Sequence, residues 1–101
     1  MIKTTIQEQN GQLIAILEGR LDTAVSEEVE EDLIPLRNCT DKDIVIDCTK
    51  LDYISSSGLR IFLNILKSAK KNGRPVYLKG MKNDLRNVMA MTGFLPLFKF
   101  L

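Results

Sequence analysis

Apolar and polar residues alternate with two different periods along this chain, and the period changes at turn residues. Residues 2–9 alternate with a period of two, which is typical of a half-exposed strand. The pair Asn10 and Gly11 that follows is a strong hairpin turn signal. Residues 12–18 are therefore expected to return as an antiparallel strand, and their almost continuous apolar run predicts burial on both faces.

The next segment has a helical period. Asp22 and Thr23 are favoured N-cap residues and stand immediately before it. Acidic residues surround the apolar positions, so the pattern predicts an amphipathic helix with an acidic outer face. Pro35 is expected to end or kink this helix. The apolar positions at helical spacing are Val25, Val29, Leu33 and Leu36.

A strand–helix–strand unit follows a polar loop. The apolar run at residues 44–46 predicts a buried third strand at the centre of the sheet. The helical period from about residue 57 to residue 72 predicts a long helix, with Gly73 placed to close it as a left-handed cap. Residues 75–78 read as a fourth strand, and this order implies a crossover between two parallel strands.

The last segment predicts one more helix and one more strand. Asn83 or Asp84 can cap the helix, Gly93 ends it, and residues 97–101 alternate weakly as a short strand. The element order is therefore β-β-α-β-α-β-α-β. This order predicts an α/β fold with a mixed sheet of four to five strands and three or more helices, in one domain that spans residues 1–101.

Composition agrees with one globular domain. Of the 101 residues, 45% are hydrophobic and 27% are charged, and no apolar run approaches the length of a membrane span. The amino-terminal residues enter a strand pattern at once and show no signal-peptide core. Cys39 and Cys48 lack the spacing of metal ligands or of a redox pair. We therefore expect two reduced thiols in a cytoplasmic protein without membrane insertion.

The net charge of +1 hides an asymmetry between the two halves of the chain. Residues 1–52 hold 5 Lys and Arg against 12 Asp and Glu, whereas residues 53–101 hold 9 against 1. If the halves form separate faces, the resulting dipole could orient a partner. A mixed sheet that interleaves the two halves would instead offset the charges, and this second arrangement is the one expected.

Three consecutive hydroxyls, Ser55, Ser56 and Ser57, stand where the central strand gives way to the long helix. One serine would suffice as an N-cap, so three exceed what the helix needs. In open α/β sheets this junction receives ligands and partners. A phosphate there would add roughly −1.5 to −2 charge beside the free N–H groups of the helix. The fold should tolerate it on a loop, whereas a docked partner should not, so the pattern indicates a switch in binding.

The sequence contains few of the motifs that enzymes use. The chain has no histidine, no Gly-x-Ser-x-Gly elbow, no phosphate-binding Gly-rich loop and no dinucleotide fingerprint. A Ser–Lys nucleophile with Lys50 stays open but unsupported, and a cation site formed by Asp22, Asp47 and Asp52 is less expected than solvated carboxylates. The aromatic residues of the basic second half are few and are largely needed by the core, so platforms on which nucleic-acid bases could stack are missing. We expect no enzyme activity, catalytic residue, cofactor, metal site or nucleic-acid partner.

Three segments in order resemble the STAS domain family, in particular bacterial anti-sigma factor antagonists (anti-anti-sigma factors). The segment from Leu51 to Leu59, LDYISSSGL, looks like the family's signature. Gly19-Arg20-Leu21-Asp22 is similar to its Gly-x-Leu-Asp element, and Met91-Thr92-Gly93-Phe94 is similar to the Thr/Ser-Gly element before the last strand. The resemblance covers nearly the whole chain, and the predicted element order is also the family's order.

The resemblance implies a phosphorylation switch at Ser56, with Ser55 and Ser57 as less favoured positions. The implied partner is a serine-kinase anti-sigma factor, which the unphosphorylated protein binds so that the sigma factor is released. Phosphorylation breaks the complex, and a serine phosphatase restores it. The predicted partner-binding residues are Asp22, Thr23, Tyr53, Ser55, Ser56, Ser57, Gly58 and Arg60.

One departure from the family pattern keeps alternatives open. Family members typically have Asp immediately before the switch serine, and this chain has Ser55. The change removes a negative charge and leaves three candidate hydroxyls. The main alternative is therefore a STAS interaction module, such as a subunit of a transport system or signalling assembly, without a kinase switch. A small nucleotide- or anion-binding protein that uses the same helix N-terminus is the third alternative.

Overall fold

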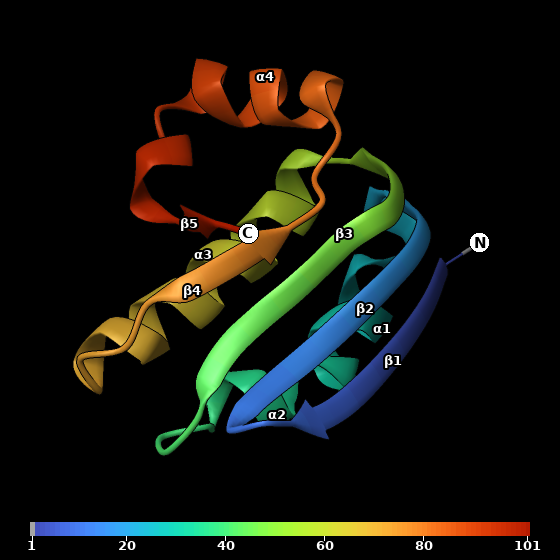
Figure 1. The fold of residues 1–101 in the computed structure, drawn as a ribbon. Helices are drawn as coiled ribbons and strands as arrows, with labels where there is room; N and C mark the ends of the chain where they lie inside the picture. Colours follow the sequence, from blue (N-terminus) through green and yellow to red (C-terminus); the bar gives the residue numbers. More distant parts are fainter. Residues whose placement is uncertain (1) are drawn as a thin grey trace.

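The computed structural model describes residues 2–101. These residues form five strands, four α-helices and two short 3-10 helices, and the predicted order of strands and helices is confirmed (Figure 1). The elements are β1 (Ile2–Gln9), β2 (Gln12–Leu21), η1 (Thr23–Val25), α1 (Ser26–Asp32), α2 (Ile34–Arg37), β3 (Asp43–Ile54), α3 (Ser56–Lys71), β4 (Val76–Lys79), α4 (Asn83–Thr92), η2 (Leu95–Leu97) and β5 (Lys99–Phe100).

The strands form one sheet in the order β1-β2-β3-β4-β5, with β3 at its centre as predicted. Only β1 runs antiparallel to its neighbour, so the sheet is mixed. Asn10 and Gly11 have φ angles of 52° and 77° and close the β1–β2 hairpin. A left-handed conformation at both turn residues matches the twist of the flanking strands, which is why this residue pair gives a tight hairpin.

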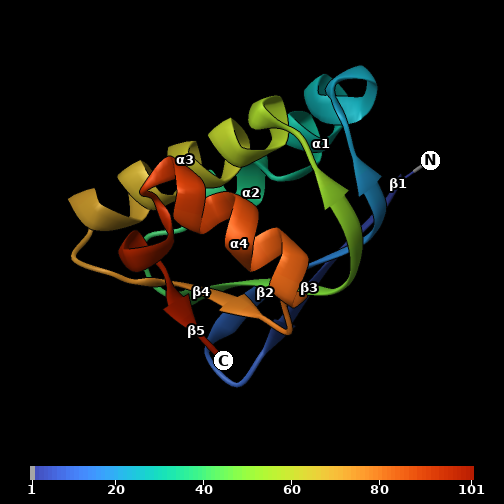
Figure 2. The ribbon, with the colours of Figure 1, turned by 90° about the horizontal axis from the view of Figure 1, so that it is seen from above.

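The helices α1, α2 and α3 form a layer on one side of the sheet (Figure 2). This arrangement corrects the expectation that β2 is buried on both faces. Along β2, buried residues such as Ala15 and Leu17 alternate with half-buried ones such as Ile14 and Ile16. The buried set faces the helices, because successive side chains of a strand point to opposite sides of a sheet.

Two elements differ in length from the sequence prediction. The strand β3 continues through the polar residues after Cys48 as far as Ile54, because its second half pairs with the end of β2 across two register irregularities. The predicted amphipathic helix is broken at Leu33 into α1 and α2. Pro35 lies in the first turn of α2, where its missing N–H costs nothing, so the predicted kink is confirmed.

The start of α4 also differs in detail. Its N-cap is Lys82, whose side chain makes no capping hydrogen bond, instead of the predicted Asn83 or Asp84. The Asp84 carboxylate accepts from the backbone N–H of Leu85 at 3.0 Å, so it acts inside the first turn. The prediction that Gly93 ends this helix is confirmed, because Gly93 has a φ of 80° and forms the C-cap of α4.

The two halves of the chain lie side by side, which corrects the expectation that they interleave. The sheet keeps the strands in chain order, so β1, β2 and most of β3 occupy one side of it and β4 and β5 the other (Figure 1). The helices α1 and α2 belong to the acidic first half, and α3 and α4 belong to the basic second half. The sheet therefore separates the two halves, and the ion pairs Arg74–Asp43 and Lys82–Asp52 join them where they meet. Among residues 2–101, no helix is long and apolar enough to cross a membrane.

Candidate functional site

The segment with the three serines lies where β2 and β3 end together. These strands are parallel, and their register places Arg20 beside Tyr53 and Leu21 beside Ile54. The carbonyl of Leu21 accepts a hydrogen bond from the backbone N–H of Ser55 at 2.9 Å. This pairing brings the residues after β2 next to the residues after β3, so Asp22 and the serines belong to one site.

The three serines are not equivalent. Ser55 is the N-cap of α3, and its Oγ accepts from the backbone N–H of Gly58 at 3.2 Å. Ser55 and Ser57 are half-buried, whereas Ser56 is exposed. Ser56 and Ser57 lie in the first turn of α3, which corrects the expectation that the serines occupy a loop. Ser56 is therefore the hydroxyl of this cluster that an enzyme can approach.

Gly58 has a packing role under the serines. It is buried, and a Cβ at this position would lie 2.6 Å from Cγ of Leu21 and 3.0 Å from Cγ1 of Ile54. Real Cβ atoms do not approach neighbours this closely, so only glycine allows α3 to start against the ends of β2 and β3. Gly58 therefore positions the start of α3, and its predicted contact with a partner stays a prediction.

Asp22 and Thr23 lie in the turn after β2, next to the start of α3. The Asp22 carboxylate caps η1 by accepting from the backbone N–H of Val25 at 3.3 Å, as the sequence predicts. Thr23 is exposed, and its carbonyl accepts from the Ser26 hydroxyl at 2.9 Å. These short-range bonds hold the turn after β2 in one shape, so it presents a fixed surface beside α3.

Tyr53 adds an exposed aromatic ring to the same region. Its side chain is 38% exposed at the end of β3. The guanidinium carbon of Arg20 lies 4.3 Å from the centroid of this ring, which is the geometry of a cation–π contact. This contact orients the ring at the surface without burying it, so Tyr53 is free to meet a partner.

A shallow cavity of about 300 Å³ opens directly beside Ser56. Arg60, one turn further along α3, also lines it, so two predicted site residues share this cavity. The sequence analysis missed its other four lining residues, because it assigned the apolar ones to the core. The Met91–Phe94 element was the available signal, since Gly93 turns the chain back toward α3 after α4. The missed residues are Leu59, Leu63, Thr92 and Phe94.

The carboxylates considered for a cation site are not brought together. Asp47 accepts from the hydroxyl of Thr49 at 2.7 Å, Asp52 pairs with Lys82, and Asp22 caps η1. Within residues 2–101, no group of three acidic, His or Cys side chains is arranged to hold a metal ion. Lys50, the candidate base, forms an ion pair with Glu18 at 3.4 Å.

Comparison with known proteins decides the family. The family model described as STAS domain matches residues 3–101. The chain belongs to the STAS domain family. The resemblance of the three sequence segments is thereby confirmed over nearly the whole chain.

Two relatives of this STAS protein are both named as anti-sigma factor antagonists. The provisionally named anti-sigma factor antagonist BtrV of Bordetella bronchiseptica is 34% identical over 97 residues, which cover 96% of this chain and 84% of that protein. The anti-sigma-B factor antagonist of Staphylococcus aureus strain NCTC 8325 is 31% identical over 75 residues, which cover 74% of this chain and 69% of that protein.

The fold also matches solved structures of SpoIIAA, an anti-sigma factor antagonist of Bacillus, in two states. The unphosphorylated form superposes with a TM-score of 0.80 at 16% identity, covering 98% of this chain and 88% of that one. The phosphorylated form gives a TM-score of 0.73 over 98% of this chain and 91% of that one. At this level of identity the likeness establishes the STAS fold.

Proposed function

We propose that this STAS domain, residues 1–101, is an anti-sigma factor antagonist that is switched by phosphorylation of Ser56. Its unphosphorylated form binds a serine-kinase anti-sigma factor in the cytoplasm and releases the sigma factor. The observation that carries the proposal is the exposure of Ser56 next to Ser55, whose oxygen already caps α3. The names of the BtrV and Staphylococcus relatives support the antagonist role.

The surroundings of Ser56 suit a phosphate. Ser56 follows the N-cap of a 16-residue helix, where backbone N–H groups are free and the helix dipole favours negative charge. Arg60 lies four residues further along the same helix and lines the same cavity, so its guanidinium is in reach of the added charge. The folded domain would therefore accept the phosphate without rearrangement.

The partner would experience the phosphate differently. The cavity beside Ser56 offers the apolar side chains of Leu59, Leu63 and Phe94 to a docking residue. A phosphate at its rim would place a strongly hydrated dianion where the partner needs a dry contact. A loss of about 3 kcal/mol of binding free energy weakens affinity roughly a hundredfold. Phosphorylation would thus act as a switch of binding, and a serine phosphatase would reverse it.

The replacement of the family's aspartate by Ser55 is compatible with this proposal. Serine and aspartate are both favoured N-cap residues, and the Ser55 oxygen makes the capping bond to the N–H of Gly58. The change therefore keeps the helix start and removes one negative charge beside Ser56. We expect the cognate kinase to recognise a neutral residue at this position.

The direct test combines the purified chain, its cognate kinase and ATP. Mass spectrometry should find one phosphate, on Ser56, in the wild type and in the Ser57→Ala control, and none in Ser56→Ala. In a binding assay Ser56→Asp should lose affinity for the kinase by roughly a hundredfold, whereas Lys67→Ala, an exposed position of α3 outside the site, should bind normally. Phosphate on another residue, or normal binding by Ser56→Asp, would refute the switch.

The second candidate is a STAS interaction module without a kinase switch, as in a transport-system or signalling-assembly subunit. The neutral Ser55 favours it, because the family's switch element has an acidic residue there. Affinity purification from the native organism separates the two candidates. Recovery of an ATP-binding kinase supports the antagonist, and recovery of a transporter or scaffold in its place supports the module.

A further inference from the structure

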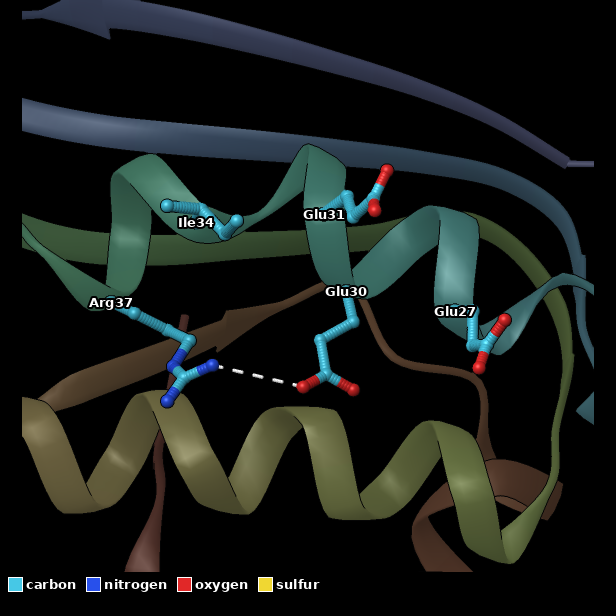
Figure 3. Close-up of a pocket in the computed structure, with 5 residues that line it drawn as sticks. All are labelled: Glu27, Glu30, Glu31, Ile34 and Arg37. Atoms are coloured by element: carbon cyan, nitrogen blue, oxygen red, sulfur yellow. Dashed lines mark ion pairs between the residues drawn. The ribbon is translucent and has the colours of Figure 1, made fainter.

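The helices α1 and α2 carry a shallow depression of about 360 Å³ lined mostly by acidic side chains. Ile34, which is 44% exposed, lies near Arg37 toward one end of it, and Glu30, Glu31 and then Glu27 follow along α1 (Figure 3). Arg37 is the basic lining residue, and its Nη1 pairs with Oε1 of Glu30 at 3.7 Å. We call these five lining residues the acidic face.

The charge of the acidic face is largely uncompensated within the molecule. The seven-residue helix α1 contains five carboxylates. Among residues 2–101, Glu30 is the one of the five that has a basic side chain within 4.0 Å. The remaining four are Glu27, Glu28, Glu31 and Asp32. A surface with this much free negative charge and an exposed isoleucine is complementary in charge to a basic surface that also exposes an apolar side chain.

Such a surface exists elsewhere on the same chain. A second depression, of about 400 Å³, surrounds the C-terminal end of α3 and the start of β5. Leu97 is 42% exposed there, and Lys70 and Lys99 are exposed without an ion-pair partner among residues 2–101. We call its lining residues the basic face: Leu66, Lys70, Gly73, Arg74, Pro75, Leu97 and Lys99.

One molecule cannot bring its own two faces together. The acidic face lies on α1 and α2 in the first half of the chain, and the basic face lies beside β4 and β5, at the sheet edge opposite β1. Two copies can meet without much overall repulsion, because the net charge of each is +1. The opposite charge of the two faces, and the exposed apolar side chain that each contains, Ile34 in one and Leu97 in the other, therefore favour contact between copies.

We propose that the acidic face of one copy docks against the basic face of a second copy in a head-to-tail contact. Such a heterologous contact leaves one free face of each sign at the ends, so it can extend beyond a dimer. The contact does not involve Ser56. The basic face is near the opposite end of α3, roughly 20 Å away by the helical rise, so self-association and the proposed switch are separable.

Sedimentation velocity of the purified chain at low and high salt tests the contact. In about 20 mM salt, where the Debye length exceeds 20 Å, the average mass should rise with protein concentration. In 1 M salt the screening length is about 3 Å and the association constant should fall tenfold or more. A protein that stays monomeric in low salt at every concentration would overturn the proposal.

A charge-swap experiment identifies the faces. Glu27→Lys/Glu31→Lys makes both faces basic, and Lys70→Glu/Lys99→Glu makes both faces acidic. Each variant alone should be monomeric, and an equimolar mixture of the two should associate, because each then supplies the face that the other lacks. Circular dichroism of each variant alone checks that both are folded. A mixture that stays monomeric, or a single variant that still associates, would overturn the assignment.

The matched control is Lys3→Glu/Lys79→Glu, which changes net charge by the same amount at exposed lysines outside both faces. It should associate like the wild type. Ile34→Ser, which removes the exposed apolar side chain of the acidic face without changing its charge, should weaken association. If the control abolishes association as fully as the basic-face variant, net charge is the cause and the proposed contact is wrong.

Discussion

At the scale of single residues, the site divides into side chains that hold it together and side chains that are left free. The fold itself uses three of them: Gly58 packs closely against the strand ends, Ser55 caps α3, and Asp22 caps η1. Ser56 and Tyr53 are exposed and support nothing beneath them. This division explains how one hydroxyl can be modified without disturbing the domain.

Gly58→Ala should destabilise the domain. Its Cβ would meet Cγ of Leu21, which is fully buried and cannot move aside easily. Overpacking of this kind costs about 1–3 kcal/mol, against a gain in helix propensity of about 1 kcal/mol. Urea denaturation should show a lower midpoint with an unchanged m-value.

The exposed Lys67→Ala on the same helix serves as the control and should unfold like the wild type. The double variant Gly58→Ala/Leu21→Ala should lose less stability than the sum of the two single changes. The smaller side chain at position 21 makes room for the new Cβ at position 58, and that Cβ fills part of the space that Leu21 leaves. A Gly58→Ala protein as stable as the wild type would show that α3 can shift away from the strand ends.

At the scale of elements, the start of α3 depends on its cap. Ser55→Ala removes the oxygen that accepts from the N–H of Gly58 and should cost about 1 kcal/mol of stability. Ser55→Asp keeps an acceptor there and should leave stability near that of the wild type. Thermal unfolding followed by circular dichroism measures both.

Ser56→Ala and Ser57→Ala provide the comparison for this prediction. Neither hydroxyl makes a hydrogen bond among the described residues, so both variants should unfold close to the wild type. An equal loss of stability in all three alanine variants would mean that the capping bond of Ser55 is not what stabilises the helix start.

The elements also show what periodicity can and cannot predict. The order of elements along the chain, the hairpin at Asn10 and the helix α3 follow from local patterns, and each is confirmed. The second half of β3 could not be predicted, because Thr49, Lys50 and Asp52 look like a loop and become a strand only through pairing with β2. Tertiary pairing overrides local preference in such cases.

The same reasoning applies to the candidate site. Its serines and Asp22 were predictable, because they occupy ends of elements that the pattern already defines. The contribution of Thr92 and Phe94 did not follow from periodicity, because these residues reach the cavity beside Ser56 only after the chain has passed through β4 and α4, and the family resemblance of the Met91–Phe94 element was the signal for it. Contacts between residues that far apart in the sequence leave no periodic signal in either segment.

At the scale of the whole molecule, the central strand of the sheet sets the response to alkaline pH. Cys48 lies in β3 and is fully buried. Loss of contact with water raises the pKa of its thiol to about 12, and the negative charge of Asp47 adds to the shift. In the unfolded chain the same thiol has a pKa of about 8.5.

The folded state therefore keeps this proton over a pH range in which the unfolded state has lost it. Ionisation of the unfolded chain favours unfolding, so stability is fully present below about pH 8.5 and falls as pH rises toward the folded pKa, by up to about 1.4 kcal/mol per pH unit from this group. Cys48→Val should remove this contribution and show a shallower decline of the urea midpoint above pH 9. Cys39→Ala, which leaves Cys48 in place, should keep the steeper decline. Equal slopes in the wild type and in Cys48→Val would mean that the buried thiol does not govern alkaline stability.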